Sequence, residues 1–459
     1  MPMANLRPLQ GLRSPFVHLY DEAGLSASIR RSITAVIFGN ICGNLWFSIT
    51  SGSALTGYAR QLGANDIAFG VLTGIPLAAT LVQFPAAMLV SRTQKRKRYM
   101  LTYGVLSRAL WIVIGLVPFF VPQNPAWLRL WSVIFLVGVA SANGSFINVC
   151  FMPWLADLVP IGIRGRWISM RDGIVSVCNV LIGLLMAYML DHIAGFPGYA
   201  LVFTLGGILG VMDMLCFLFA EEMRRETAPP RVSFRQVMGQ VLCDKPFFRF
   251  ILFWTAWCFT ANLSGPYLQR YALEMGLSFI ELTVCGQIAS ALATVLVISR
   301  WGRLMDRYGT KPVLWVSCIA ASLTPGFFLA QTAGSIWPLL LHSFIGALFW
   351  SAANTASMSK LLSSSPDDQR PSYVAFYACV TNLLGAFAGI LSGGSILQGL
   401  QSLMGDGARF LGMDRYQLLI VLSVVARLGV VLLFVPRLHN EREATASQML
   451  KDMAGRFRR

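Results

Sequence analysis

The sequence predicts an all-α integral membrane protein with twelve transmembrane helices, arranged as two pseudo-symmetric six-helix bundles. The 459 residues are 55% hydrophobic and only 13% charged, whereas about a quarter of the residues in soluble domains are charged. Apolar stretches long enough to cross a bilayer, roughly 20 residues each, can be drawn twelve times. In addition, similar residues recur at a nearly constant spacing in the two halves of the chain.

The twelve expected spans define the domain organisation. They are 33–58, 67–90, 99–121, 128–153, 173–191, 200–220, 247–271, 279–299, 312–331, 335–360, 372–396 and 416–436. We expect an N-terminal arm (1–32), an N-terminal bundle (33–220), a linker (221–246), a C-terminal bundle (247–436) and a basic tail (437–459). Within the linker, the amphipathic stretch 234–242 is expected on the inner membrane surface.

The distribution of basic residues predicts the orientation. A net charge of +16 would suit nucleic-acid binding. However, when residues within three positions of a span end are counted with the adjoining segment, thirty of the 37 Lys and Arg residues fall on one side of the expected membrane and five on the other. Because cytoplasmic loops carry the excess of Lys and Arg, this split places both termini in the cytoplasm of a multi-pass inner-membrane protein. No nucleic-acid partner is needed to explain the charge.

Internal repetition supports two related halves. Tyr58, Gly63, Ile67 and Val71 recur 213 residues later as Tyr271, Gly276, Ile280 and Val284. A second set recurs 206 residues later: Asn148, Met152, Pro160, Arg164 and Trp167 correspond to Asn354, Met358, Pro366, Arg370 and Tyr373. Ordered matches at nearly constant offsets indicate a duplicated six-helix unit.

A tight basic hairpin between spans 8 and 9 carries the most specific motif. It resembles the signature of the major facilitator superfamily, Gly-x-Leu-x-Asp-Arg-x-Gly-Arg-Lys-x-x-Leu. The matches are Gly302, Leu304, Asp306, Arg307, Gly309, Lys311 and Leu314, while Thr310 replaces the usual Arg. The loop 154–166 and the span 247–271 resemble a bacterial branch whose substrates are largely unknown. The resemblance implies the major facilitator fold, in which helices 1, 4, 7 and 10 line a central cavity.

Polar side chains recur on one face of those same four spans. Because polar groups inside a membrane usually face a partner or a watery cavity, we expect a substrate site there. The candidate residues are Asn40, Asn44, Trp46, Asn148, Asn262, His342, Trp350 and Asn354. The alternative is that the amides only hydrogen-bond between helices and that the tryptophans and His342 only pack.

Two further groups are expected to control movement. We expect Asp306 and Arg307, with Arg92 opposite, to hold the cytoplasmic side closed when the cavity faces outward, and we add the repeat pair Arg164 and Arg370 to this gate. Glycines spaced by four in span 2 (Gly70, Gly74) and span 11 (Gly385, Gly389, Gly393) could mark where the halves slide, or only tight packing.

Two arginines, Arg108 and Arg427, lie deep inside spans, and neither should face lipid at such depth. Arg108 and Asp213 fall at similar depths in spans 3 and 6, which predicts an ion pair with a structural role, or alternatively a role in proton coupling. Span 9 offers no acid to Arg427. Arg427 should therefore bond carbonyls or hydroxyls such as those of Ser317 and Ser322, or bind an anionic group of the substrate.

These features predict a secondary transporter of a small polar organic solute, such as a sugar, coupled to protons or sodium and acting as a monomer. The alternatives are an exporter of lipophilic compounds and a non-transporting membrane sensor. Motifs of serine hydrolases, zinc proteases and ATP-binding loops are absent from the sequence, so we expect no enzyme and no cofactor. The nine scattered cysteines suggest neither disulfides nor a metal site.

Overall fold

The structure, a computed structural model, describes residues 26–93, 95–220, 239, 241, 243–366, 370–405, 408–438 and 447–449. These residues are almost entirely helical, and their one extended pairing is an isolated bridge between Phe410 and Met413. Residues 1–25 of the expected arm, most of the amphipathic stretch 234–242 and most of the tail 437–459 lie outside the described residues.

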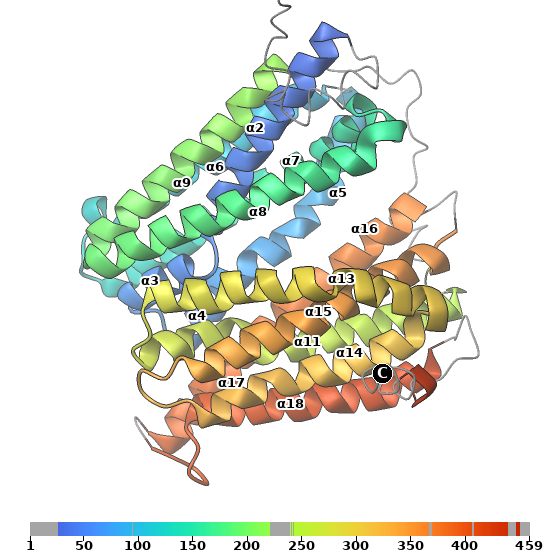
Figure 1. Cartoon of the computed structure of the whole chain (residues 1–459). Helices are drawn as coiled ribbons and strands as arrows, with labels where there is room; N and C mark the ends of the chain where they lie inside the picture. Colours follow the sequence, from blue (N-terminus) through green and yellow to red (C-terminus); the bar gives the residue numbers. More distant parts are fainter. Residues whose placement is uncertain are drawn as a thin grey trace, which may run out of the picture.

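The helices of the first half form one group, here called the N bundle, and those of the second half form the C bundle (Figure 1). The N bundle contains α2 (Ala27–Thr50), α3 (Ser53–Gln61), α4 (Asp66–Ala78), η2 (Ala79–Val82), α5 (Gln83–Thr93), α6 (Arg96–Phe120), α7 (Ala126–Leu158), α8 (Ile161–His192), α9 (Phe196–Cys216) and η3 (Phe217–Phe219). The C bundle contains α11 (Lys245–Glu274), α12 (Phe279–Thr283), η4 (Val284–Ile288), α13 (Ala289–Tyr308), α14 (Thr310–Leu323), η5 (Thr324–Ala330), α15 (Trp337–Ser364), α16 (Arg370–Val380), η6 (Thr381–Phe387), α17 (Ala388–Met404), α18 (Arg415–Phe434) and η7 (Val435–Arg437).

This architecture confirms the predicted fold class. In the described part of the chain, 11 helical segments are long and apolar enough to cross a membrane. The remaining expected span, 247–271, lies in the 30-residue helix α11. That helix is long enough to cross a bilayer, but polar residues such as Asn262, Gln269 and Arg270 lower its mean hydropathy. Because buried positions run along the whole of α11, neighbouring helices shield it from lipid.

The backbone repeats the duplication seen in the sequence. The turn after α3 ends with Gly63 at φ +74, and the turn after α11 ends with Gly276 at φ +88, a left-handed conformation that glycine adopts easily. Two residues later, the Asn65 and Ser278 side chains cap the next helix by accepting a backbone hydrogen bond. Equivalent residues 213 positions apart therefore build the same helical hairpin.

A pair of lysines shows the same duplication at the opposite ends of the bundles. Lys97 donates to carbonyls at the end of the sixth span, and Lys311 does so at the end of the twelfth. The acceptors are the carbonyls of Leu218 and Ala220 for Lys97, and those of Pro436 and Leu438 for Lys311. Each lysine thereby satisfies carbonyls that a helix end leaves unpaired.

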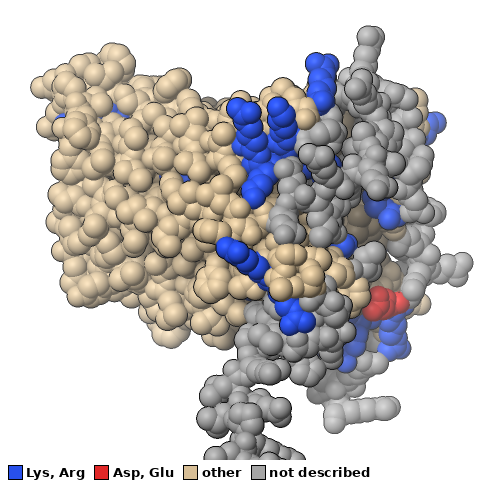
Figure 2. Space-filling model, turned by 90° about the horizontal axis from the view of Figure 1, so that it is seen from above, with Lys and Arg blue, Asp and Glu red and all other residues tan. Residues whose placement is uncertain are grey.

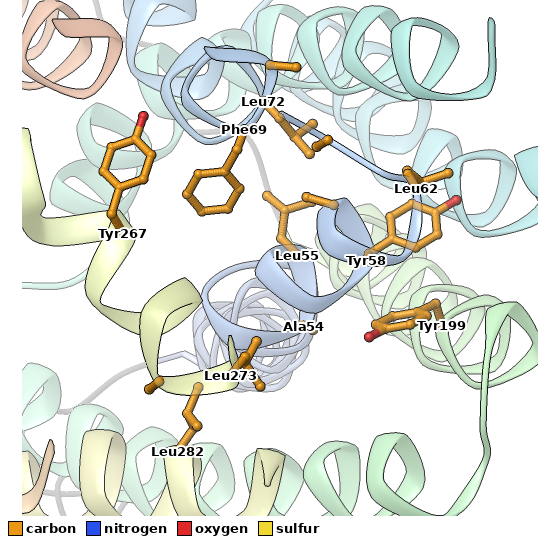
Figure 3. Packing of buried hydrophobic residues seen from close by; sticks show 14 of the residues in the cluster. Ala54, Leu55, Tyr58, Leu62, Phe69, Leu72, Tyr199, Tyr267, Leu273 and Leu282 are labelled. Atoms are coloured by element: carbon orange, nitrogen blue, oxygen red, sulfur yellow. The ribbon is translucent and has the colours of Figure 1, made fainter. Parts of the chain in front are cut away.

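The two bundles meet at one end and separate toward the other (Figure 1). At the closed end, where α3 leads into α4, one hydrophobic cluster includes Leu55, Tyr58 and Phe69 of the N bundle with Tyr267 and Leu282 of the C bundle (Figure 3). Two further clusters each belong to a single bundle. We call the end where α5 finishes and α16 begins the open end, because no shared cluster of described residues joins the bundles there.

Candidate functional site

A cavity of about 460 Å³ lies between the two bundles. The N bundle contributes the junction between α2 and α3, and the C bundle contributes α11, the α12–η4–α13 segment and α15. Its polar lining consists of Ser53, Gln269, Gln287, Ser290, His342, Ser343 and Trp350. Groups from both bundles therefore line one cavity.

Two interruptions of helical geometry border this cavity. Between α2 and α3 the chain breaks at Gly52, whose φ of 63 and ψ of −127 suit only glycine. Opposite the break, Oε1 of Gln269 lies 3.9 Å from where a Cβ on Gly52 would stand. The π-helix η4 carries Gly286 and Gln287 onto the lining. Broken helices and π-turns in membrane helices frequently mark binding sites.

The lining is polar but carries no Lys, Arg, Asp or Glu. Its amides and hydroxyls can both donate and accept hydrogen bonds. The Trp350 ring lies 4.5 Å from that of Trp257, which in turn lies 5.1 Å from Trp254, so an aromatic wall supports this side of the cavity. Such a lining can hold an uncharged polar molecule that also has a flat apolar face.

Two of the substrate-site candidates, His342 and Trp350, line this cavity. His342 packs against the Phe328 ring at 5.4 Å between centroids. Its Nδ1 is buried without a hydrogen-bond partner among the described residues. This nitrogen is therefore available to a polar group that rearranges or binds nearby.

The asparagine candidates lie elsewhere. Asn44 donates to Asn40, to its Oδ1 at 3.0 Å and its carbonyl at 2.7 Å, and Asn262 donates to a carbonyl one turn earlier in α11. Asn148 on α7 and Asn354 on α15 are exposed. None of these five side chains lines the 460 Å³ cavity.

Trp46 lies in the interior of the N bundle, beside the predicted ion pair. Arg108 Nη2 is 3.5 Å from Asp213 Oδ2, and both side chains are buried. The Arg108 guanidinium also lies 3.4 Å from the centre of the Trp46 ring, which adds a cation–π contact. A Cβ on Gly43 would stand 2.5 Å from Asp213 Oδ2, so glycine is needed for α2 to approach α9 here.

Arg427 is only 2% exposed and is bound to α11. Its Nη2 donates to the Ala261 carbonyl at 2.7 Å and to Ser264 Oγ at 3.0 Å, and its Nε donates to Ser423 Oγ at 3.1 Å. The expected alternative of carbonyl and hydroxyl acceptors is therefore observed. This arrangement cross-links α18 to α11 close to Pro266, the proline inside α11.

The prediction that the hydroxyls of Ser317 and Ser322 accept hydrogen bonds from Arg427 was wrong. Ser317 and Ser322 both donate to carbonyls four residues earlier in their own helix, α14. The depth of a residue in its span does not reveal which neighbouring helix its side chain will reach.

The predicted gate residues all lie toward the open end, near the ends of α5, α8, α13 and α16. They are Arg92, Arg164, Asp306, Arg307 and Arg370. Arg164 donates to the Val159 carbonyl in the preceding turn, and the Arg307 guanidinium lies 5.1 Å from the Tyr308 ring. The two bundles are apart at this end of the molecule (Figure 1).

Ion pairs that were not anticipated from the sequence link the two bundles at the closed end. Asp66, at the start of α4, is 1% exposed. It forms ion pairs across the bundle interface with Arg270 of α11 at 3.3 Å and with Arg415 of α18 at 2.8 Å. We call these three residues the latch. Glu274 also contacts both arginines, at 3.1 and 3.9 Å.

Other contacts across the same interface reinforce the latch. Arg60 donates to the Leu273 carbonyl at 2.8 Å, and the Asp191 carboxylate accepts from the backbone N–H groups of Phe279 and Ile280. The sequence contained one signal for these contacts. Of the five cations assigned to the sparsely charged side of the expected membrane, which include arginines close to a span end, three are Arg60, Arg270 and Arg415.

Together, the two helical bundles, the polar cavity between them and the ion pairs that join them at one end define a class, that of multi-pass membrane proteins with the fold of a transporter. The model of the Major Facilitator Superfamily matches residues 36–390 and 287–448. The chain belongs to this family, as the signature in the hairpin before α14 implied.

Solved structures support the same fold. A bacterial homolog of the human lysosomal transporter Spinster, inward-facing and unoccupied, is 16% identical, with a TM-score of 0.68 over 94% of this chain and 99% of that one. The nucleoside transporter NupG, in a mutant form, is 14% identical, with a TM-score of 0.66 over 89% and 100%. The xylose transporter XylE from E. coli, inward open, is 15% identical, with a TM-score of 0.61 over 91% and 99%. A comparison with the sequences of curated proteins gave no match.

Proposed function

We propose that this protein is a secondary transporter that moves an uncharged polar organic solute, such as a sugar, by alternating access. The observation that carries the proposal is the cavity of about 460 Å³ between the bundles, which offers amides, hydroxyls and a tryptophan but no charge. A carboxylate or ammonium group on the solute would lose its hydration there without gaining an opposite charge.

In this proposal His342 and Trp350 contact the solute together with Gln269 and Gln287. Trp350 would cover an apolar face of the solute, while the two glutamines would bind its hydroxyls. Asn148 and Asn354, exposed on α7 and α15, would line the path from the open end, with Asn40, Asn44 and Asn262 along the same route.

The distribution of basic residues supports an orientation in which the open end and both termini face the cytoplasm. The structure then corresponds to an inward-facing state in the inner membrane, with the latch closing the outer side. In the outward-facing state, the latch separates and the proposed gate of Arg92, Asp306 and Arg307, with Arg164 and Arg370, closes the cytoplasmic side.

Transport by the full-length protein in proteoliposomes tests this function. Counterflow of labelled neutral sugars and nucleosides would be compared with that of amino acids, sugar phosphates and a lipophilic cation. Repeating uptake with imposed pH and sodium gradients would identify any coupling ion. Flux restricted to charged or lipophilic compounds would contradict the proposal, and solute binding without flux would favour a sensor.

Two variants test whether the transported solute binds in this cavity. Gln287→Ala and Trp350→Ala should each lower the apparent affinity for the solute by about tenfold, the effect of losing one hydrogen bond or one aromatic contact. Trp337→Ala is the matched control, since Trp337 is 65% exposed at the start of the same helix. An unchanged affinity in both cavity variants would place the solute elsewhere.

A further inference from the structure

A second concave site lies on the side of the N bundle that faces away from the C bundle's cavity lining, and none of its residues lines the cavity between the bundles. This groove has a volume of about 530 Å³ and runs between α2 and the end of α9 with η3. Its lining includes Arg30, Arg31, Thr34, Phe38 and Phe219. All of these residues belong to one bundle, so opening and closing of the transporter need not alter the groove.

The groove is charged at one end and apolar along the rest. Arg30 and Arg31 lie in the first turns of α2. In the view from above, Lys and Arg side chains gather toward one end of the molecule (Figure 2). Phe38 follows two turns later and is 61% exposed, and Phe219 is 59% exposed. At 1.5 Å per residue, Phe38 lies roughly 12 Å further along α2 than Arg30.

Arg31 joins the two parts. Its guanidinium lies 5.8 Å from the centre of the Phe219 ring, which orients the charge over the apolar part of the groove. The side chain remains exposed. An anion bound at Arg31 would therefore be adjacent to apolar surface that suits a hydrocarbon chain.

We propose that this groove binds an anionic phospholipid of the inner leaflet. The phosphodiester binds Arg30 and Arg31, which offer fixed planar donors for phosphate oxygens, and one acyl chain lies along Phe38 and Phe219. The anionic lipids of this leaflet attract basic residues at the membrane boundary. A free phosphate ion would satisfy the arginines but would leave the aromatic surface uncovered.

The C bundle provides an internal comparison. At the repeat offset of 213, the positions of Arg30 and Arg31 are occupied by Cys243 and Asp244. Lys245 follows one residue later, so the equivalent position offers one basic residue beside an acidic one in place of two adjacent arginines. We therefore expect one such lipid site for each chain, on the N bundle.

Native mass spectrometry of the full chain, released from detergent, tests the proposal. The probes are palmitoyl-oleoyl phosphatidylglycerol, the zwitterionic phosphatidylcholine with the same chains, and inorganic phosphate. We expect one tightly bound phosphatidylglycerol, with clearly weaker phosphatidylcholine. The variant Arg30→Gln/Arg31→Gln should bind phosphatidylglycerol roughly 30-fold more weakly, since each basic residue at the surface contributes about tenfold or less.

Two further variants keep the test decisive. Ala35→Trp fills the groove, whose lining includes Ala35, without changing the charge, and should also lose the lipid. Arg98→Gln removes an exposed arginine of the same bundle outside the groove and should keep it. Undiminished binding in Ala35→Trp, equal binding of phosphatidylcholine, or saturation of the site by inorganic phosphate alone would each overturn the proposal. Because the readout is binding, it does not depend on the transported solute.

Discussion

The Asp213 carboxylate sits in the interior of the N bundle, where its counter-charge is Arg108 at 3.5 Å. Removing one member of a buried pair leaves the other charge uncompensated, which typically costs about 3–5 kcal/mol. Asp213→Asn should therefore lower the yield of folded protein and its thermal stability, measured by fluorescence-detected size exclusion before and after heating.

Two controls separate this effect from general sensitivity to mutation. Asp172→Asn breaks a 2.7 Å ion pair whose carboxylate side chain is 57% exposed, and exposed pairs contribute only about 0–1 kcal/mol. The double variant Asp213→Asn/Arg108→Met removes both buried charges and should recover stability. If Asp213→Asn folded normally but lost only gradient-driven accumulation, Asp213 would instead be the coupling carboxylate.

Arg427 differs from Arg108 because its acceptors are neutral. Arg427→Gln removes a buried charge without leaving an opposite one unpaired, so the protein should fold with a smaller loss of stability than Asp213→Asn. Transport should fall, because the donors that hold the Ala261 carbonyl and Ser264 of α11 are lost. Folded yield and solute counterflow, measured on the same preparation, distinguish this outcome from one in which both remain normal.

At the scale of whole helices, the glycines of α4 and α17 serve two different interfaces. A Cβ on Gly70 would stand 2.6 Å from the Tyr267 hydroxyl and 3.3 Å from the Ile390 carbonyl, both in the C bundle. Gly389 instead faces the backbone of α11 at Phe259, inside the C bundle. The expectation that these glycines mark the contact between halves therefore applies to Gly70 but not to Gly389.

This difference predicts different outcomes for the same substitution. Gly70→Ala should disturb only the closed end and shift the protein toward states in which that end is open, with little loss of stability. Gly389→Ala should destabilise the C bundle in every conformation. Cysteine accessibility at the closed end, together with thermal stability, would distinguish the two, and equal loss of stability in both variants would contradict the assignment.

The helices and the site were predictable to different degrees. Hydropathy located the spans, but it missed parts of the helices beyond the hydrocarbon layer, so that α8 begins at Ile161 rather than near residue 173. Helical periodicity selected the faces carrying His342 and Trp350. It could not select Gln287, because a π-turn changes which side chains share a face. Nor could it identify the acceptors of Arg427, which depend on the packing of α18 against α11.

At the scale of the whole molecule, the latch depends on how the two bundles meet. The sequence of one half alone does not predict that contact. The family signature drew attention to Asp306 and the open end. The distribution of charge held the complementary signal, since arginines on the sparsely charged side need a specific reason to be there. For Arg270 and Arg415 that reason is the ion pair that each forms with Asp66, which lies more than two hundred residues earlier in the chain.

The latch and the proposed cytoplasmic gate predict opposite responses to the same change from Asp to Asn. Asp66→Asn weakens two ion pairs that exist only while the closed end is shut, whereas the separated groups would be hydrated in the other state. A loss of about 2 kcal/mol from one state alone would change the ratio of the two conformations roughly 30-fold, toward opening of this end. Asp306→Asn should instead favour the conformation described here, because it weakens contacts proposed for the other state.

Distances between spin labels on the two bundles would measure both shifts. A pair at Gln61 and Thr332, both exposed near the closed end, should move apart in Asp66→Asn and stay close in Asp306→Asn. Arg129→Gln is a suitable control, because Arg129 also lies near this end but donates to the Val121 carbonyl within its own bundle. Unchanged distances in Asp66→Asn would show that the hydrophobic cluster around Tyr58 and Tyr267, rather than the ion pairs, keeps this end shut. A shift in the same direction for both aspartate variants would remove the basis for assigning Asp306 to the opposite gate.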